Sequence, residues 1–133
     1  MSKFVKSFVA TVAALALLTV FAVAEEKQEP KKEKAKPKHT IKEVMKKGFK
    51  GKDALRGKVL SGKATDKEKL ALLDMFVSLV ESKPPKGDDA SWQKLAGTSA
   101  LAAAKVAVGR EGAIDELKKA TNCKACHDAH KGK

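Results

Sequence analysis

The sequence predicts an all-α protein, an up-down-up-down bundle of four helical segments. After residue 40, apolar residues recur at three- and four-residue spacings, and no stretch alternates apolar and polar residues as a half-buried strand would. Connections of about 3–8 residues separate the segments, and connections this short favour antiparallel neighbours.

The first 24 residues have the pattern of a secretory signal peptide. Lys3 and Lys6 precede an apolar run over residues 8–23, which closes on the small-x-small sequence Ala22-Val23-Ala24. An uncleaved anchor helix is the alternative, because the run approaches the ~20 apolar residues that a membrane span needs. Cleavage would leave 133 − 24 = 109 residues, enough for one domain. We expect this domain in the periplasm, without stable membrane insertion.

The chain is strongly basic. Its formal charge of +12 falls to +10 when Lys3 and Lys6 leave with the signal peptide. This excess favours an acidic partner or an anionic surface, or it serves only to keep a small protein soluble. Nothing resembles a nucleic-acid-reading motif, so no nucleic-acid partner is expected. Residues 25–39 are charged, contain two prolines and predict a disordered linker before a domain at 40–133.

The first helical segment begins after Thr40 and continues, past a kink, into a short piece over residues 53–61. The second begins at the capping box Thr65-Asp66-Lys67-Glu68 and stops before Pro84-Pro85, because proline cannot donate a backbone hydrogen bond. The inward residues expected are Ile41, Val44, Met45, Phe49, Leu55, Val59 and Leu60 on the first, and Leu70, Leu73, Phe76, Val77 and Val80 on the second.

The third segment is capped by Asp88 or Asp89 and ends at Gly109. Its small residues would admit a neighbouring helix or a flat ligand, or are simply good helix formers. The fourth begins near Ala113 and is expected to run unbroken into the C-terminal cysteine motif. The inward residues expected are Trp92, Leu95, Ala96, Ser99, Ala103 and Val106 on the third, and Ile114, Leu117 and Ala120 on the fourth.

The two cysteines lie in Cys123-Lys124-Ala125-Cys126-His127, the C-x-x-C-H spacing with which c-type haem is attached. On a helix these positions share one face, so the two thiols can bond the haem vinyl groups while His127 binds the iron. Three other uses of the two cysteines are possible. A redox dithiol would need a βαβ setting, which this sequence lacks, and a zinc site would need His130 as a fourth ligand. A disulfide between the two cysteines is possible in an exported protein. The adjacent histidine and the export signal favour one covalent haem c, which would also complete a core with few aromatic residues.

A haem motif at the C-terminal end of a helical domain of about 100 residues resembles the class II cytochromes c, the cytochrome c′ family of four-helix bundles. The likeness covers residues 40–131. In this family an aromatic and then a basic residue follow the motif; in this chain Lys131 fits the basic position, whereas His130 departs from the aromatic one. The resemblance implies haem in the bundle core with Lys131 beside it, and a protein that is not an enzyme. Some members of the family form homodimers.

The resemblance also implies that the distal residue comes from the first helix, where electron-transferring members carry the equivalent of Met45. An axial Met or His suits electron transfer, whereas an open position would bind nitric oxide or another small gas. His39, at the mouth of the same helix, is the competing ligand or a solvated side chain. Met75 is expected to pack, and His130 to lie near the haem edge or in solvent.

The sequence therefore leads to the expectation of a periplasmic one-electron carrier, with haem c attached through Cys123 and Cys126 and bound by His127 and Met45. Its lysines would steer it toward acidic redox partner proteins, with rates that fall as salt is added. One alternative is a five-coordinate haem protein that binds a gas. A further alternative is a haem-free cationic helical binding module with one disulfide.

Overall fold

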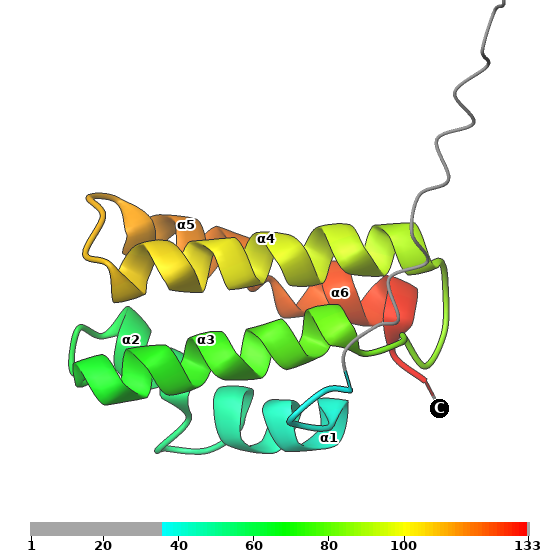
Figure 1. The fold of residues 1–133 in the computed structure, drawn as a ribbon, viewed down its shortest axis with the longest axis horizontal. Helices are drawn as coiled ribbons and strands as arrows, with labels where there is room; N and C mark the ends of the chain where they lie inside the picture. Colours follow the sequence, from blue (N-terminus) through cyan, green and yellow to red (C-terminus); the bar gives the residue numbers. More distant parts are fainter. Residues whose placement is uncertain (1–35, 133) are drawn as a thin grey trace, which may run out of the picture. The chain divides into compact units, whose positions relative to one another are not determined.

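The computed structural model describes residues 36–132, and this part of the chain contains helices and connections but no strand (Figure 1). The all-α prediction is confirmed for it. The predicted signal peptide, and the predicted linker up to residue 35, lie outside the described residues. The elements are α1 (Ile41–Glu43), the π-helix η1 (Val44–Phe49), α2 (Leu55–Leu60), α3 (Asp66–Glu81), α4 (Asp89–Ala107), α5 (Ala113–Ala120) and α6 (Cys123–His130).

The longest helices, α3 and α4, pack side by side and form the centre of the fold (Figure 1). On one side η1 and α2 pack against α3, and on the other α5 and α6 pack against α4, while α2 also reaches α5. No helix between residues 36 and 132 combines the length and apolar character needed to cross a bilayer.

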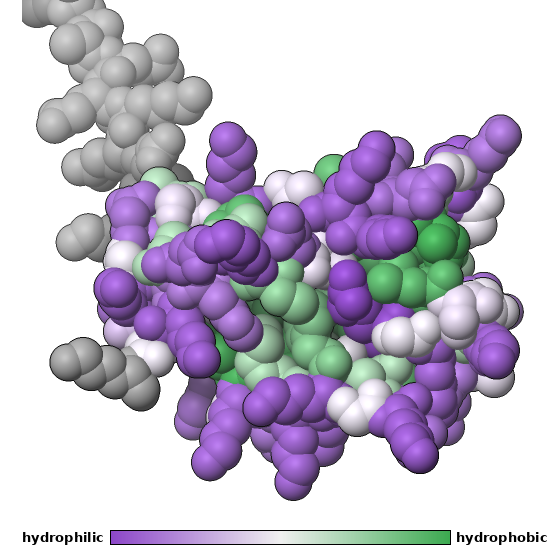
Figure 2. All heavy atoms as spheres, turned by 180° about the vertical axis from the view of Figure 1, so that it is seen from behind, coloured by the Kyte–Doolittle hydropathy of each residue, from purple (hydrophilic) through white to green (hydrophobic). Residues whose placement is uncertain are grey.

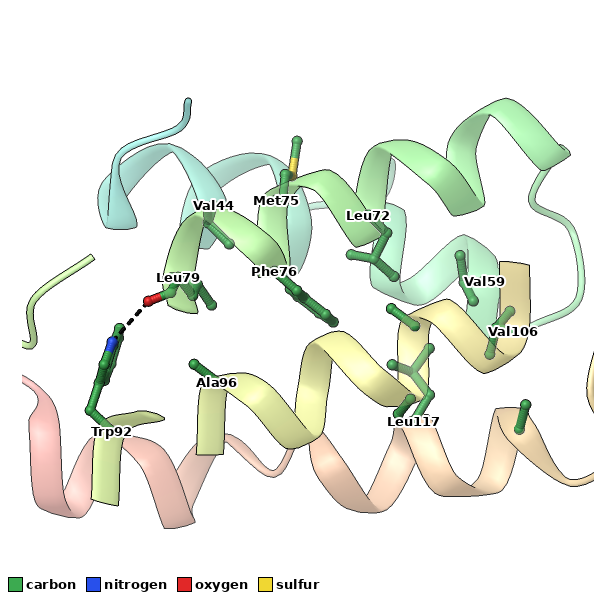
Figure 3. Packing of buried hydrophobic residues seen from close by; sticks show 13 residues of the cluster. Val44, Val59, Leu72, Met75, Phe76, Leu79, Trp92, Ala96, Val106 and Leu117 are labelled. Carbon is green, nitrogen blue, oxygen red and sulfur yellow. Dashed lines mark hydrogen bonds between the residues drawn. The ribbon is translucent and has the colours of Figure 1, made fainter. Parts of the chain in front are cut away.

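The core between these helices is built around Phe76, which is fully buried and lies 5.6 Å, centroid to centroid, from Phe49. Trp92 joins the start of α4 to the end of α3. Its indole N–H donates to the Leu79 carbonyl at 2.8 Å (Figure 3) and also to the Ser82 carbonyl at 3.0 Å. Alanines fill much of the remaining α4 face, and they let α3 and α5 approach closely.

The predicted helix starts at Thr40 and Thr65 are confirmed, and both form complete capping boxes. Asp88, one of the two candidates, caps α4 by accepting from Ser91 N–H at 2.8 Å. The inward face predicted for α3 was partly wrong, because Leu70 and Val77 are 56 % and 39 % exposed. Apolar residues occur on nearly every side of α3, so spacing allows several stripes, and packing selects the one formed by Leu72, Met75, Phe76 and Leu79.

The first predicted helix is not one kinked helix. Its second half, η1, closes with a hydrogen bond from Lys50 N–H to the Met45 carbonyl, five residues back, at 3.1 Å. Lys50 is then extended and Gly51 takes a positive φ of 97°, a conformation open to glycine at little cost, so α2 starts as a separate helix. The periodicity of the apolar residues alone does not reveal this π-turn.

The prediction of an unbroken final helix was also wrong, because α5 ends at Ala120 and α6 begins at Cys123. The side chain of Asn122 accepts hydrogen bonds from the N–H groups of Lys124 at 3.0 Å and Ala125 at 3.4 Å. The Thr121 hydroxyl accepts a hydrogen bond from Arg56 Nε–H, in another helix, at 2.7 Å. Asn and Thr favour such local bonds over helix continuation, and the bond from the distant Arg56 adds to them at Thr121.

The capping box of α3 makes stability depend on pH. Hydrogen bonds from the Lys58 ammonium and the Thr65 N–H, both at 2.9 Å, lower the pKa of Glu68 from its ordinary 4.5 to about 2. A carboxylate whose pKa is lower in the folded state stabilises above pH 4.5, and this contribution is lost as the pH falls from 4.5 to about 2. We expect Glu68→Gln to lower the free energy of unfolding at pH 7 and to flatten its pH dependence in that window, as measured by urea titrations.

The control for this prediction is Glu111→Gln, at an exposed carboxylate for which no ion pair occurs with any residue from 36 to 132. It should leave the pH dependence as in the unmodified protein. Identical profiles for both variants would refute the assignment to Glu68.

Candidate functional site

A cavity of about 720 Å³ opens where α1, η1, the start of α4 and α6 meet. Its size falls within the ~300–1,000 Å³ of small-molecule and cofactor sites. Most of its wall is apolar, and the face in Figure 2 shows a hollow with an apolar floor and hydrophilic edges. The apolar lining comes from Ile41, Met45, Phe49, Leu79, Trp92, Leu95 and Ala96.

One wall of this cavity is α6, and Cys123, Cys126 and His127 all line it. They come from one helix at positions i, i+3 and i+4, which share a face. Both cysteines are free thiols, Cys123 exposed and Cys126 half-buried. Burial, and secondarily the neighbouring Cys123, raises the pKa of Cys126 above its ordinary value, so this thiol is protonated at neutral pH.

The three histidines differ in the hydrogen-bond partners of their ring nitrogens. His127 lines the cavity, and its ring makes no hydrogen bond or ion pair to the part of the chain that is described. His39 does not line the cavity; its Nε2 lies 3.1 Å from Asp74 Oδ2, and its backbone N–H donates to Ser78 Oγ at 3.2 Å. Of the proposed ligands His127 and His39, the structure therefore brings only His127 to the cavity.

His130 is buried, with an exposed fraction of 2 %. Its Nδ1 lies 3.0 Å from the Lys86 carbonyl, so Nδ1 carries the hydrogen, and its Nε2 lies 2.7 Å from Ser91 Oγ. The ring meets Trp92 edge to face at 5.4 Å. Of the two expected positions for His130, the one in solvent is wrong, because the residue is buried and lines the cavity. Its hydrogen bonds anchor α6 to α4 and to the α3–α4 turn.

Met45 lies half-buried in η1 and lines the same cavity as the cysteine motif, some eighty residues away in sequence. Lys131, which caps the end of α6, lies at the cavity as well. Met75 does not line it; it is buried in the core, where its sulfur would lie 3.6 Å from a Cβ at Gly48. The predicted packing role of Met75 is confirmed.

The sequence did not indicate the groups that hold α6 in place. Ser91 and the Lys86 carbonyl bind His130, Arg56 binds Thr121 just before the helix, and Gly87 leaves room for the His130 ring. The turn signal Pro84-Pro85-Lys86-Gly87 could have indicated a tight connection, but not that His130 would fill it. Arg56 carries no local signal, since its partner Thr121 is 65 residues away.

The donor set at the cavity fits covalently attached haem. Nowhere in residues 36–132 do three His, Cys, Asp or Glu side chains gather closely enough to hold an ion by themselves. A zinc site would also need His130, both of whose ring nitrogens are engaged. Two free thiols, one uncommitted imidazole and an apolar cavity are what a flat macrocycle with an iron centre requires.

Comparisons with protein-family models, curated proteins and solved structures give no significant match to this chain. The resemblance to class II cytochromes c thus depends on the motif, on its place in the chain and on the helix pattern.

The contact between Gly87 and His130 should be decisive for stability. Gly87 has φ +84°, and a Cβ there would lie 2.6 Å from the Ala129 carbonyl oxygen and 2.8 Å from His130 Nδ1. We expect Gly87→Ala to cost about 1–3 kcal/mol more in unfolding free energy than Gly109→Ala, measured in urea. Gly109 is a matched control, because it has φ +72° with nothing within 4 Å of its Cβ position. Equal costs would mean that α6 is not held at this point.

Proposed function

We propose that this protein is a periplasmic c-type cytochrome of class II type that carries one covalently attached haem and transfers one electron at a time. The observation that carries the proposal is the shared cavity, which Cys123, Cys126 and His127 line from α6 and Met45 lines from η1. Haem, when bound, supplies an iron centre that changes between two oxidation states.

In this proposal the residues of α6 attach and orient the group. Cys123 and Cys126 provide the two thioether links, and His127 is the proximal ligand because its ring is uncommitted. His130 cannot compete for this role, since both of its ring nitrogens are hydrogen-bonded. This division between two nearby histidines supports His127 as the sole ligand from α6.

Met45 provides the distal ligand, and the apolar side chains around it exclude water. A closed site of this kind changes oxidation state with little rearrangement, which suits a carrier rather than an enzyme. Two of the three aromatic side chains in the described part, Phe49 and Trp92, border the cavity. A bound macrocycle would thereby extend the core rather than lie outside it.

The arrangement of the helices supports a four-helix bundle around this site. The four members of the bundle would be the pair α1 and η1, then α3, then α4, and finally the pair α5 and α6. The short helix α2 lies in the chain between the first and the second member. Lys131, at the cavity and just after α6, stands where the family carries a basic residue. Export, as its N-terminal pattern predicts, would deliver the chain to where c-type haem is attached.

Covalent haem is the first test. Expressed with the c-type maturation machinery, the protein should give a pyridine haemochrome spectrum with one haem per chain. Cys123→Ala with Cys126→Ala should abolish attachment, because no other cysteine exists in the sequence. Absence of covalent haem in the unmodified protein would rule out both the electron carrier and the gas-binding haem protein. It would favour a haem-free cationic binding module.

The distal ligand is the second test. Met45→Ala should convert a low-spin ferric absorption spectrum into a high-spin one, because the sixth position opens. Met75→Ala is the control: it should cost about 2–5 kcal/mol of stability through a core cavity and leave the spectrum unchanged. A high-spin spectrum in the unmodified protein would instead support the gas-binding alternative, and an unchanged spectrum in Met45→Ala would remove Met45 from the iron.

A further inference from the structure

Five lysines lie within the eleven residues 42–52, which run from α1 through η1 into the connection before α2. We call them the α1–η1 basic face; they are Lys42, Lys46, Lys47, Lys50 and Lys52. Lys42 and Lys50 line the main cavity. Lys46, Lys47, Lys50 and Lys52 surround a second hollow of about 480 Å³. Because Lys50 borders both, the face is continuous with the mouth of the main cavity.

Within residues 36–132 the lysines of this face form no ion pair, in contrast to lysines elsewhere, and Asp53 is the one acidic residue that lines the second hollow with them. Five lysines outside the face form ion pairs with carboxylates: Lys38, Lys58, Lys69, Lys105 and Lys124. Among the described residues, no ammonium group of the α1–η1 basic face has such a pair. Two carboxylates adjoin the face in sequence. Glu43, next to Lys42, is already engaged by the N–H and hydroxyl of Thr40 at 2.9 and 3.0 Å, and Asp53, next to Lys52, faces four lysines around the second hollow.

Local structure does not account for this concentration of charge. Lys46 and Lys47 gain from the negative end of the helix dipole, but Lys42 lies in the first turn, where a cation is disfavoured. Four of these lysines, Lys46, Lys47, Lys50 and Lys52, surround one hollow, and like charges gathered in this way repel. Carboxylates brought by a partner would relieve this repulsion.

Apolar side chains accompany the lysines at the cavity mouth. Ile41, Met45 and Phe49 are half-buried there, between lysines that precede and follow them. An apolar centre with a charged rim is the composition of a protein–protein interface, whereas a phosphate backbone would need the charges alone. These observations favour a folded acidic protein over nucleic acid.

We propose that the α1–η1 basic face is the docking surface for an acidic partner protein. The inference rests on the proposed function, in which that partner exchanges electrons with the group in the main cavity. Docking here would bring the partner to the side of the cavity that Met45 lines, and would shorten the path for the electron.

The experiment compares two variants with the same loss of charge. The first replaces Lys46, Lys47, Lys50 and Lys52 by Gln. The control replaces Lys63, Lys67, Lys118 and Lys119, which are exposed and line neither hollow. The probe is a poly-aspartate peptide. It is titrated, at low and at physiological ionic strength, into the full protein as purified from cells that contain the c-type maturation machinery.

We expect the first variant to lose about tenfold or more in affinity at low salt, and the control no more than about threefold, because specific attraction depends on where charges lie and not only on their sum. Equal losses would overturn the proposal, since net charge would then suffice. Tighter binding of a DNA duplex of equal charge, with the same loss in the first variant, would overturn it in favour of a nucleic-acid surface.

A second measurement separates this inference from the proposed function. The rate at which hexacyanoferrate(III), an anion, oxidises the haem-loaded protein should fall with salt, and this slope should shrink in the first variant but not in the control. Equal slopes in the two variants would overturn the docking face while leaving the cytochrome intact. Absence of haem would overturn the proposed function, and the peptide titration would still decide the docking face.

Discussion

The hydrogen bond from Arg56 Nε–H to Thr121 Oγ1, at 2.7 Å, fixes the point at which the C-terminal part of the chain changes direction. Thr121 is buried and also donates to the Leu117 carbonyl at 2.6 Å, so α5 is closed here by one residue with two partners. Asn122 then starts α6 with its own cap. Were the helix to continue instead, the cysteine motif would follow the axis of α5. The position of the cysteine motif at the cavity therefore depends on this junction.

The far end of α6 is fixed by a different interaction. His130 is held between Ser91 and the Lys86 carbonyl and packs edge-on against Trp92. A buried ring with both nitrogens satisfied is stable where it lies, and leaving either partner unpaired would carry a desolvation penalty of about 1–3 kcal/mol. With both ends held, the segment between them can leave Cys123, Cys126 and His127 without partners of their own. Two fixed helix ends with unengaged thiols and an imidazole between them are the preorganisation that the proposed haem attachment would need.

Sequence predicted well those features that depend on a few neighbouring residues. The capping boxes at Thr40 and Thr65 are local, and most of the inward face expected for α4 is correct because alanines, Trp92 and Val106 leave one apolar stripe. On α3 several stripes compete, and only packing against α4 and η1 decides. The helix break at Thr121, with Arg56 as its partner, and the burial of His130 depend on residues 39 to 65 positions away, which no spacing rule reaches. For the candidate site, spacing could place three residues on α6 and Met45 on another helix, but not show that they line one cavity.

The π-turn of η1 links the two proposals physically. Its closing bond runs from Lys50 N–H to the Met45 carbonyl, so a residue of the basic face lies one turn beyond the proposed distal ligand. π-helical turns carry a less favourable geometry than α-helical ones and are found frequently at functional sites. Met45 and Phe49 of η1, and Lys50 just after it, all line the main cavity. A partner that orders Lys50 would therefore also restrain the backbone that carries Met45, so docking and the environment of the bound group share one short element.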